Sequence, residues 1–181
     1  MGFYAYSFIL SLKGRILMAL RNIIYIEDPL LRKQSRKVEK FDAKLHKLLD
    51  DMAETMKEAN GVGLAAPQVA VLRQVVVMDC GTGLIEMINP EILSTEGEQT
   101  GPEGCLSVPG RRGEVTRPMK VRVRFQDRYG EWQEMECEEL LARCVMHETD
   151  HLKGRLYVDI MNQEIFDDDI DGEDDEEDAE E

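Results

Sequence analysis

Two histidines stand four positions apart in the segment VMHETDHLKG, residues 145–154. On a helix, positions i and i+4 lie on one face, so the imidazoles of His147 and His151 can bind one metal ion. Glu148 then points about 100° around the helix axis, where a general base could stand beside the ion. A solvated pair of histidines is the alternative. Apolar residues on the same helix stripes favour a face turned to a core or cleft: Leu140, Leu141, Cys144, Val145 and Leu152.

A coordination sphere built on two imidazoles needs a further ligand, and the remaining histidine, His46, lies far away in the sequence. Cys105 stands in the segment EGCLSVPG, residues 103–110, where glycine and proline give the backbone freedom to bring a thiol to an ion. One thiolate and two imidazoles leave an open position, which is the arrangement of a catalytic metal site. The alternative is a small buried hydrophobic residue, a description that fits Cys144 on the helix better.

A third segment whose residues could contribute to a functional site is GVGLAAPQV, residues 61–69. Its glycines resemble a dinucleotide-binding loop, but the segment follows a predicted helix and precedes a predicted strand, which is the reverse of the required order. We expect instead a loop whose small residues let the backbone approach a ligand closely. Gln68 can donate a hydrogen bond into such a site.

The elements that must position these residues follow from the apolar pattern. Apolar residues spaced by three and four predict an amphipathic helix from Phe41 to Asn60, which Gly61 ends. The HExxH segment lies on a second predicted helix, from about Glu138 to Lys153, with acids at its start and Gly154 as its stop.

Strands are predicted between the two helices. The expected segments are residues 74–79, residues 87–93 with a break at Pro90, residues 118–126, and residues 131–137 after a turn. They do not alternate with helices, so the pattern predicts an α+β domain.

The length of the chain and the distribution of its charge indicate the domain organisation. A chain of 181 residues suits one domain, and its formal net charge of -15 is concentrated at one end. Residues 164–181 hold thirteen acids and no base, which leaves 22 bases and 24 acids elsewhere. We expect a disordered acidic tail over residues 166–181, which argues against nucleic-acid binding through this end. The four cysteines show no C-x-x-C spacing, so reduced thiols are expected.

The N-terminal residues carry an apolar stretch from Phe3 to Leu12, with Lys13 and Arg15 after it. A secretory signal has the opposite order and a membrane span is longer, so neither is expected. We expect an extension over residues 1–17 and a catalytic domain over residues 18–165. A cytoplasmic protein is predicted, with organellar targeting as the alternative, because no acid precedes Glu27.

Together, the three segments resemble the signature motifs of peptide deformylase: GxGxAAxQ, EGCxS, and HExxH in its HExDH form. The resemblance covers about residues 20–165. It implies an antiparallel sheet packed around the HExxH helix, and removal of the formyl group from N-formylmethionine at the start of nascent polypeptides. It also implies a ferrous ion, replaceable by nickel, cobalt or zinc, held by Cys105, His147 and His151.

The resemblance also implies roles for individual residues. Glu148 is the general base for a water whose pKa the ion lowers. The side-chain amide of Gln68 and the backbone N–H of Leu106 meet the negative charge that develops on the formyl oxygen. Gly63 lines the substrate path.

Two arginines, Arg112 and Arg117, follow the cysteine segment and could hold the acids Glu103 or Asp150. We expect neither arginine to be catalytic, and we expect Asp150 to be a supporting anion on the helix side away from the metal ion.

The acidic end has a consequence for partners, because bacterial relatives can carry a basic C-terminal helix that docks on the ribosome. Ribosome contact through this end is therefore not expected, and neither a membrane nor a nucleic acid is an expected partner. Two other functions remain as alternatives: a metallopeptidase of the HExxH type and a non-catalytic, metal-bearing interaction protein.

Overall fold

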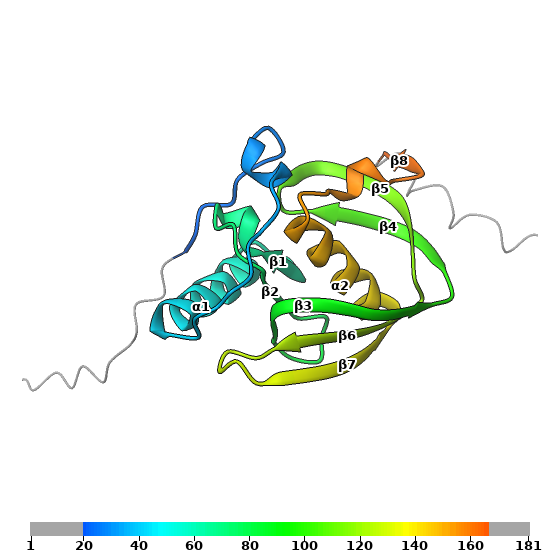
Figure 1. Ribbon diagram of the computed structural model, residues 1–181. Helices are drawn as coiled ribbons and strands as arrows, with labels where there is room; N and C mark the ends of the chain where they lie inside the picture. The colour runs from blue at the N-terminus through cyan, green and yellow to red at the C-terminus, as the bar shows by residue number, and fades with distance from the viewer. Residues whose placement is uncertain (1–19, 167–181) are drawn as a thin grey trace, which may run out of the picture.

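The computed structural model describes residues 20–166 (Figure 1). Within that range lie two α-helices, α1 (Ala43–Glu58) and α2 (Glu139–Leu152), and two β-sheets whose paired strands are all antiparallel. The α+β prediction is confirmed. The predicted extension over residues 1–17 and residues 167–181 of the predicted tail lie outside the described residues.

Helix α2 runs through the centre of the molecule, with the larger sheet on one side and the smaller sheet on the other (Figure 1). The five-stranded sheet has the order β1-β2-β3-β6-β7 and the three-stranded sheet the order β4-β5-β8. The strands are β1 (Gly63–Ala65), β2 (Val75–Met78), β3 (Ile85–Glu96), β4 (Gln99–Cys105), β5 (Val108–Arg117), β6 (Lys120–Gln126), β7 (Trp132–Glu138) and β8 (Gln163–Ile165).

Helix α1 covers the outer face of the larger sheet. Its first turn is capped by Asp42, whose carboxylate accepts hydrogen bonds from the backbone N–H groups of Lys44 and Leu45. The predicted apolar positions are all buried against the sheet: Leu45, Leu48, Leu49, Met52 and Met56. The helix is two residues shorter at each end than predicted, because Asp42 begins it and Ala59 is its C-terminal cap.

Strand β2 is buried on both faces because a helix covers each of them. Val75 and Val77 pack into the cluster that contains the apolar residues of α1, while Val76 and Met78 pack into the cluster under α2. Successive side chains of a strand point to opposite faces, so one short apolar run serves both cores.

The strand predicted to break at Pro90 is continuous. Strand β3 runs through Pro90, and the register shifts between Ile88 and Glu91. Asn89, between them, has a positive φ of 53°, and its amide bonds Val38 and Gln126. Proline lacks an N–H and is tolerated where the ladder is irregular, so the chain passes it with a bulge.

Four strands near the site were not predicted as strands. Strand β1 and a 3-10 helix (Ala66–Val69) occupy part of the segment expected to be a loop. Strands β4 and β5 form a hairpin in a stretch rich in glycine and proline, residues that are depleted in strands. Strand β8 pairs with β5, so Glu164 and Ile165 of the acidic run belong to the folded domain.

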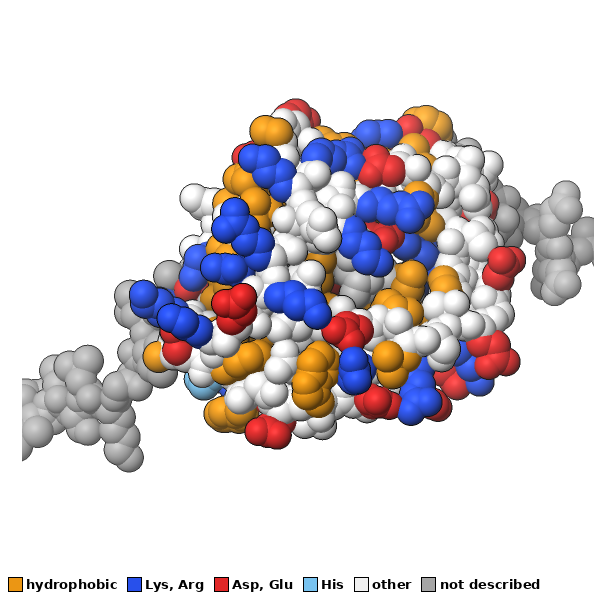
Figure 2. Space-filling model, viewed as in Figure 1, with side chains coloured by type: hydrophobic (Ala, Val, Ile, Leu, Met, Phe, Trp, Pro, Cys, Tyr) orange, Lys and Arg blue, Asp and Glu red, His pale blue; other side chains and the backbone are white. Residues whose placement is uncertain are grey.

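No helix within residues 20–166 is long and apolar enough to cross a lipid bilayer. On the face drawn in Figure 2, basic, acidic and apolar side chains are interspersed.

Helix α2 ends as predicted, because Gly154 has a φ of +75°. A Cβ at this position would lie 2.5 Å from the backbone oxygen of Arg32 and 3.1 Å from the backbone nitrogen of Lys33. The C-terminal end of α2 is therefore packed directly against the backbone at Arg32 and Lys33.

We expect Gly154→Ala to lower the free energy of unfolding by more than the conformational strain alone. A matched control is Gly110→Ala, because Gly110 has a similar φ of +71° but open space where a Cβ would lie. The control should lose about 1–2 kcal/mol, the strain of a left-handed backbone. Urea unfolding of the two variants measures the difference. An equal loss of unfolding free energy in both would show that the backbone at Arg32 can move aside at little cost.

Candidate metal centre

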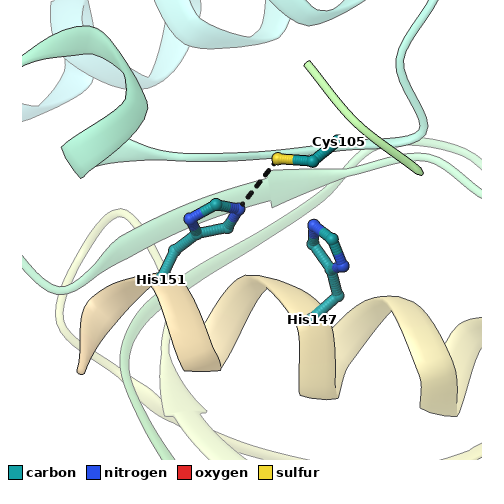
Figure 3. Close-up of side chains that lie close together, drawn as sticks. All are labelled: Cys105, His147 and His151. Carbon is teal, nitrogen blue, oxygen red and sulfur yellow. Dashed lines mark hydrogen bonds between the residues drawn. The ribbon is translucent and has the colours of Figure 1, made fainter. Parts of the chain in front are cut away.

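A sulfur and two imidazoles converge between the two sheets (Figure 3). Cys105 is the last residue of β4, and His147 and His151 lie on α2. One ligand atom from each residue lies within 4.8 Å of the other two, and Cys105 Sγ is 3.3 Å from His151 Nε2. Ligand atoms bound to one ion at roughly 2.0–2.3 Å must lie within about twice that distance of one another. The donor set therefore fits a single divalent transition-metal ion.

The orientation of His147 is fixed from behind by Glu103. His147 Nδ1 lies 2.9 Å from Glu103 Oε2, which leaves Nε2 as its ligand atom. Arg117 in turn donates hydrogen bonds to both oxygens of Glu103, at 2.9 and 3.1 Å. Burial opposes ionisation of Glu103, but the hydrogen bonds from His147 and Arg117 outweigh it and lower the pKa of Glu103 to about 2.

Two arginines connect the smaller sheet to helix α2. Arg117, on β5, donates to Asp150 on α2 at 2.6 Å as well as to Glu103 on β4. Arg143, on α2, donates to Glu103 Oε1 at 3.0 Å and to the backbone oxygen of Val115 at 2.9 Å. The element that carries the cysteine and the element that carries the histidines are thus joined by charged hydrogen bonds.

The two histidines differ in their affinity for a proton. Burial and the charge of His147 lower the pKa of His151 well below its usual value, so its imidazole is neutral, the form that binds a metal ion. Burial also disfavours a charge on His147, but hydrogen bonds with Cys105 and Glu103 outweigh it and raise the pKa of His147 to about 10. A metal ion binding there displaces that proton.

Glu148 lies beside the cluster with a free oxygen. Its side chain is buried, and its Oε2, like His151 Nδ1, has no hydrogen-bond partner within the described part of the chain. Burial raises the pKa of Glu148 to about 7. An unpaired buried carboxylate next to a metal-ligand cluster is placed to bind a water or a substrate N–H.

The side chain of Gln68 also reaches the cluster, where it lies beside Cys105. Its Oε1 accepts a hydrogen bond from the backbone N–H of Ala65 at 2.8 Å, which fixes the orientation of the amide. Its Nε2 donates to Ser107 Oγ at 3.2 Å and lies 3.4 Å from Cys105 Sγ. The Gln68 amide nitrogen therefore faces the cluster at Cys105 while it also donates to Ser107.

Gly63 is close to the catalytic side chains because it has no side chain of its own. A Cβ on Gly63 would overlap the carboxylate of Glu148 and would lie 3.0 Å from the sulfur of Cys144. Strand β1 thereby lies directly against α2 at the position of the HExxH motif.

A cavity of about 720 Å³ opens onto the cluster. Its walls come from the chain around β1, from β4 and β5, from α2 and from the C-terminal strand β8. The residues that line it include Val62, Gly63, Gln68, Cys105, Leu106, Leu140, His147 and Glu148. The volume suits a small molecule or the end of a peptide.

The structure brings the predicted site residues together at this cavity: Gly63, Gln68, Cys105, Leu106, His147, Glu148 and, behind the cavity, His151. Of the two arginines considered, Arg117 holds Glu103 and Asp150, whereas Arg112 lies on the exposed face of β5. Arg143 and Ser107 were missed. A charged residue on an amphipathic helix is normally assigned to the solvent, so no feature of the sequence indicated that Arg143 is buried.

The fold and the site define an α+β metal-dependent hydrolase. A family profile described as polypeptide deformylase matches residues 20–165. A peptide deformylase of Agathobacter rectalis is 56% identical over 150 residues, which are 83% of this chain and 95% of the relative.

Two solved structures of peptide deformylases are also similar to this chain. The Thermotoga maritima structure has a TM-score of 0.79 at 42% identity and covers 80% of this chain and 99% of its own. The Legionella pneumophila structure has a TM-score of 0.77 at 46% identity and covers 80% and 87%. The chain belongs to the peptide deformylase family, metal-dependent hydrolases that remove N-formyl groups.

We expect Arg117→Met to destabilise the protein by about 3–5 kcal/mol, because it leaves the buried carboxylate of Asp150 without its cation and leaves Glu103 with Arg143 alone. Arg112→Met is the matched control, since it removes an exposed arginine from the same strand. Chemical unfolding of both variants tests this expectation. A loss below about 1 kcal/mol for Arg117→Met would mean that the network contributes little.

Proposed function

We propose that this chain removes the formyl group from N-formylmethionine at the start of nascent polypeptides, with a ferrous ion held by Cys105, His147 and His151. The observation that carries the proposal is the convergence of one sulfur and two imidazoles, within 4.8 Å, beside the cavity. Thiolate and imidazole ligands suit iron, nickel, cobalt and zinc, so the last three are expected to substitute.

The ion, when bound, supplies Lewis-acid chemistry that lowers the pKa of a water and polarises a carbonyl. Glu148 accepts the proton of the attacking water and returns it to the departing amine. Its free Oε2 and its raised pKa, near 7, support that exchange, because a base must both take and release the proton near neutral pH.

Negative charge gathers on the formyl oxygen as its carbon becomes tetrahedral. We assign its stabilisation to the side-chain amide of Gln68 and the backbone N–H of Leu106. The hydrogen bond from Ala65 to Gln68 Oε1 supports this assignment, because it keeps the amide nitrogen of Gln68 beside Cys105 and Ser107 before substrate arrives. Preorganised donors need no rearrangement during the reaction.

The peptide part of the substrate is assigned to the cavity beside β1. Strand β1 is the edge strand of the larger sheet, and the chain at Gly61–Gly63 lines the cavity. An extended peptide can hydrogen bond to such an edge, while its first side chain enters the cavity. Gly63 is thus proposed to line the substrate path while it leaves room for Glu148.

The setting of the reaction is also part of the proposal. We place the protein in the cytoplasm, where it meets nascent chains, with organellar targeting as the alternative. A ribosomal docking site in the acidic C-terminal run is not proposed, because that run and the ribosomal RNA carry charge of the same sign.

The decisive experiment offers the iron-loaded protein a formyl-methionyl peptide and its unformylated twin. Release of formate from the first peptide alone is expected. Cleavage of internal peptide bonds in either peptide would favour the metallopeptidase alternative. Metal binding without any hydrolysis would favour the non-catalytic alternative.

We expect Glu148→Ala to retain the metal ion and lose nearly all turnover, because the base is not a ligand. Cys105→Ala is the opposite case and should lose the metal ion. Elemental analysis after gel filtration, with formate release measured on the same samples, separates the two effects. A Cys105→Ala protein that holds iron as tightly as the parent would refute the assignment of the sulfur ligand.

We expect Gln68→Ala to keep the metal ion and lower kcat by on the order of a hundredfold or more, the loss typical of an oxyanion-hole donor. Ser107→Ala is the matched control, because it removes the hydroxyl that accepts from Gln68 and leaves the donor in place. Comparable kcat values for the two variants would argue that Gln68 has only a structural role.

A further inference from the structure

The thiol of Cys144 forms part of the site without a role in the proposed reaction. Cys144 lies one turn before Glu148 on α2, and its sulfur donates to the backbone oxygen of Val62 at 3.7 Å. The same sulfur would be 3.0 Å from a Cβ on Gly63, so it fills the space beside the backbone of β1. Any displacement of this sulfur therefore alters the contact between β1 and the helix that carries Glu148.

A second thiol lies on the same face of the sheet. Cys80 follows β2 by two residues, and the pairing with β1 extends to it, since Asp79 N donates to Val62 O at 2.9 Å. Because side chains alternate along a strand, Cys80 continues the row of Val76 and Met78, which pack under α2. Cys80 and Cys144 therefore belong to the same core cluster, and both lie close to Val62, whose backbone oxygen accepts from Cys144 Sγ and from the N–H of Asp79, the residue before Cys80.

The two thiols differ in exposure and acidity. Cys80 is partly exposed, whereas Cys144 is buried. The hydrogen bond between them lowers the pKa of Cys80 and raises the pKa of Cys144. A reachable thiol with thiolate character beside a buried thiol is the arrangement of a reactive cysteine and its resolving partner.

The third member of the same core cluster, Cys137, does not share these properties. Its side chain is 1% exposed, and burial raises its pKa to about 11. It therefore serves as an internal comparison for the reactivity of the pair.

We propose that Cys80 and Cys144 form a redox-sensitive modification site, at which a peroxide converts the two thiols to a disulfide that closes down the adjacent active site.

The chemistry balances in two steps. The thiolate of Cys80 attacks one oxygen of hydrogen peroxide, the O–O bond breaks, and sulfenic acid and hydroxide form. The thiol of Cys144 then displaces the sulfenic oxygen, so an S–S bond forms and water leaves with the thiol proton. In sum, two thiols lose two electrons and two protons, and one peroxide is reduced to two waters.

The disulfide changes the site because its sulfurs are only about 2.05 Å apart. Cys144 Sγ, which lies against the backbone of Gly63 on the helix turn that precedes Glu148, must shift to form this bond. Loss of activity on oxidation rests on the proposed function, but formation of the disulfide does not, so the two can fail separately.

The test uses the full chain loaded with nickel, because ferrous iron itself reduces peroxide. Treatment with hydrogen peroxide is expected to lower the protein mass by two units and to lower kcat/KM for a formyl-methionyl peptide at least tenfold. A thiol reductant is expected to restore both. Digestion with trypsin and a glutamate-specific protease separates the four cysteines, so the linked pair can be read by mass spectrometry.

Cys80→Ser is expected to keep the activity of the parent and to resist peroxide inactivation, whereas Cys137→Ala should be inactivated like the parent. A link that involves Cys105 or Cys137, or oxidation of Cys80 without any link, would overturn the proposed pair. A Cys80–Cys144 link with unchanged turnover would overturn its effect on the active site. If the untreated protein released no formate, the proposed function would fail, and the mass measurement would still decide whether the pair forms.

Discussion

The structure depends on the buried ion pairs that hold the smaller sheet against helix α2. The sulfur of the candidate metal site comes from β4 and its imidazoles come from α2, so the three groups stay together only while these two elements keep their distance and angle. Glu103, between Arg117, Arg143 and His147, is the common partner through which both elements are fixed. Strong, directional hydrogen bonds between charged groups suit this task better than apolar contacts, which allow sliding.

The same network explains why one acid in the site is left unpaired. Two buried arginines, Arg117 and Arg143, neutralise two buried carboxylates, Glu103 and Asp150. Glu148 has no cation of its own within hydrogen-bond distance among the described residues, so burial dominates and its pKa rises towards neutrality. Glu103 and Glu148 thus differ in proton affinity because only Glu103 is paired with cations.

The site could be predicted from the sequence because its residues occur in short motifs whose spacing reflects local geometry, such as the i and i+4 histidines on α2. The helices followed from their apolar periodicity in the same way. The β4–β5 hairpin could not be predicted, because its glycines and prolines hide the strand signal. Without that hairpin, nothing distinguished Arg112 from Arg117, although they lie five positions apart and therefore on opposite faces of β5. The role of Arg143 was not predicted for a related reason. It donates to backbone oxygens of the smaller sheet, and only the tertiary structure shows that this sheet lies beside α2.

Strand β8 is the last element of the domain in the sequence, and it completes the wall of the cavity. Cys105, His147 and His151 all precede it, yet Glu164 and Ile165 of this last strand line the cavity. During synthesis from the N-terminus, the candidate metal ligands therefore emerge before Glu164 and Ile165, which complete the wall of the cavity. A polypeptide interrupted ahead of residue 163 would carry Cys105, His147 and His151 but would lack the part of the cavity wall that Glu164 and Ile165 form.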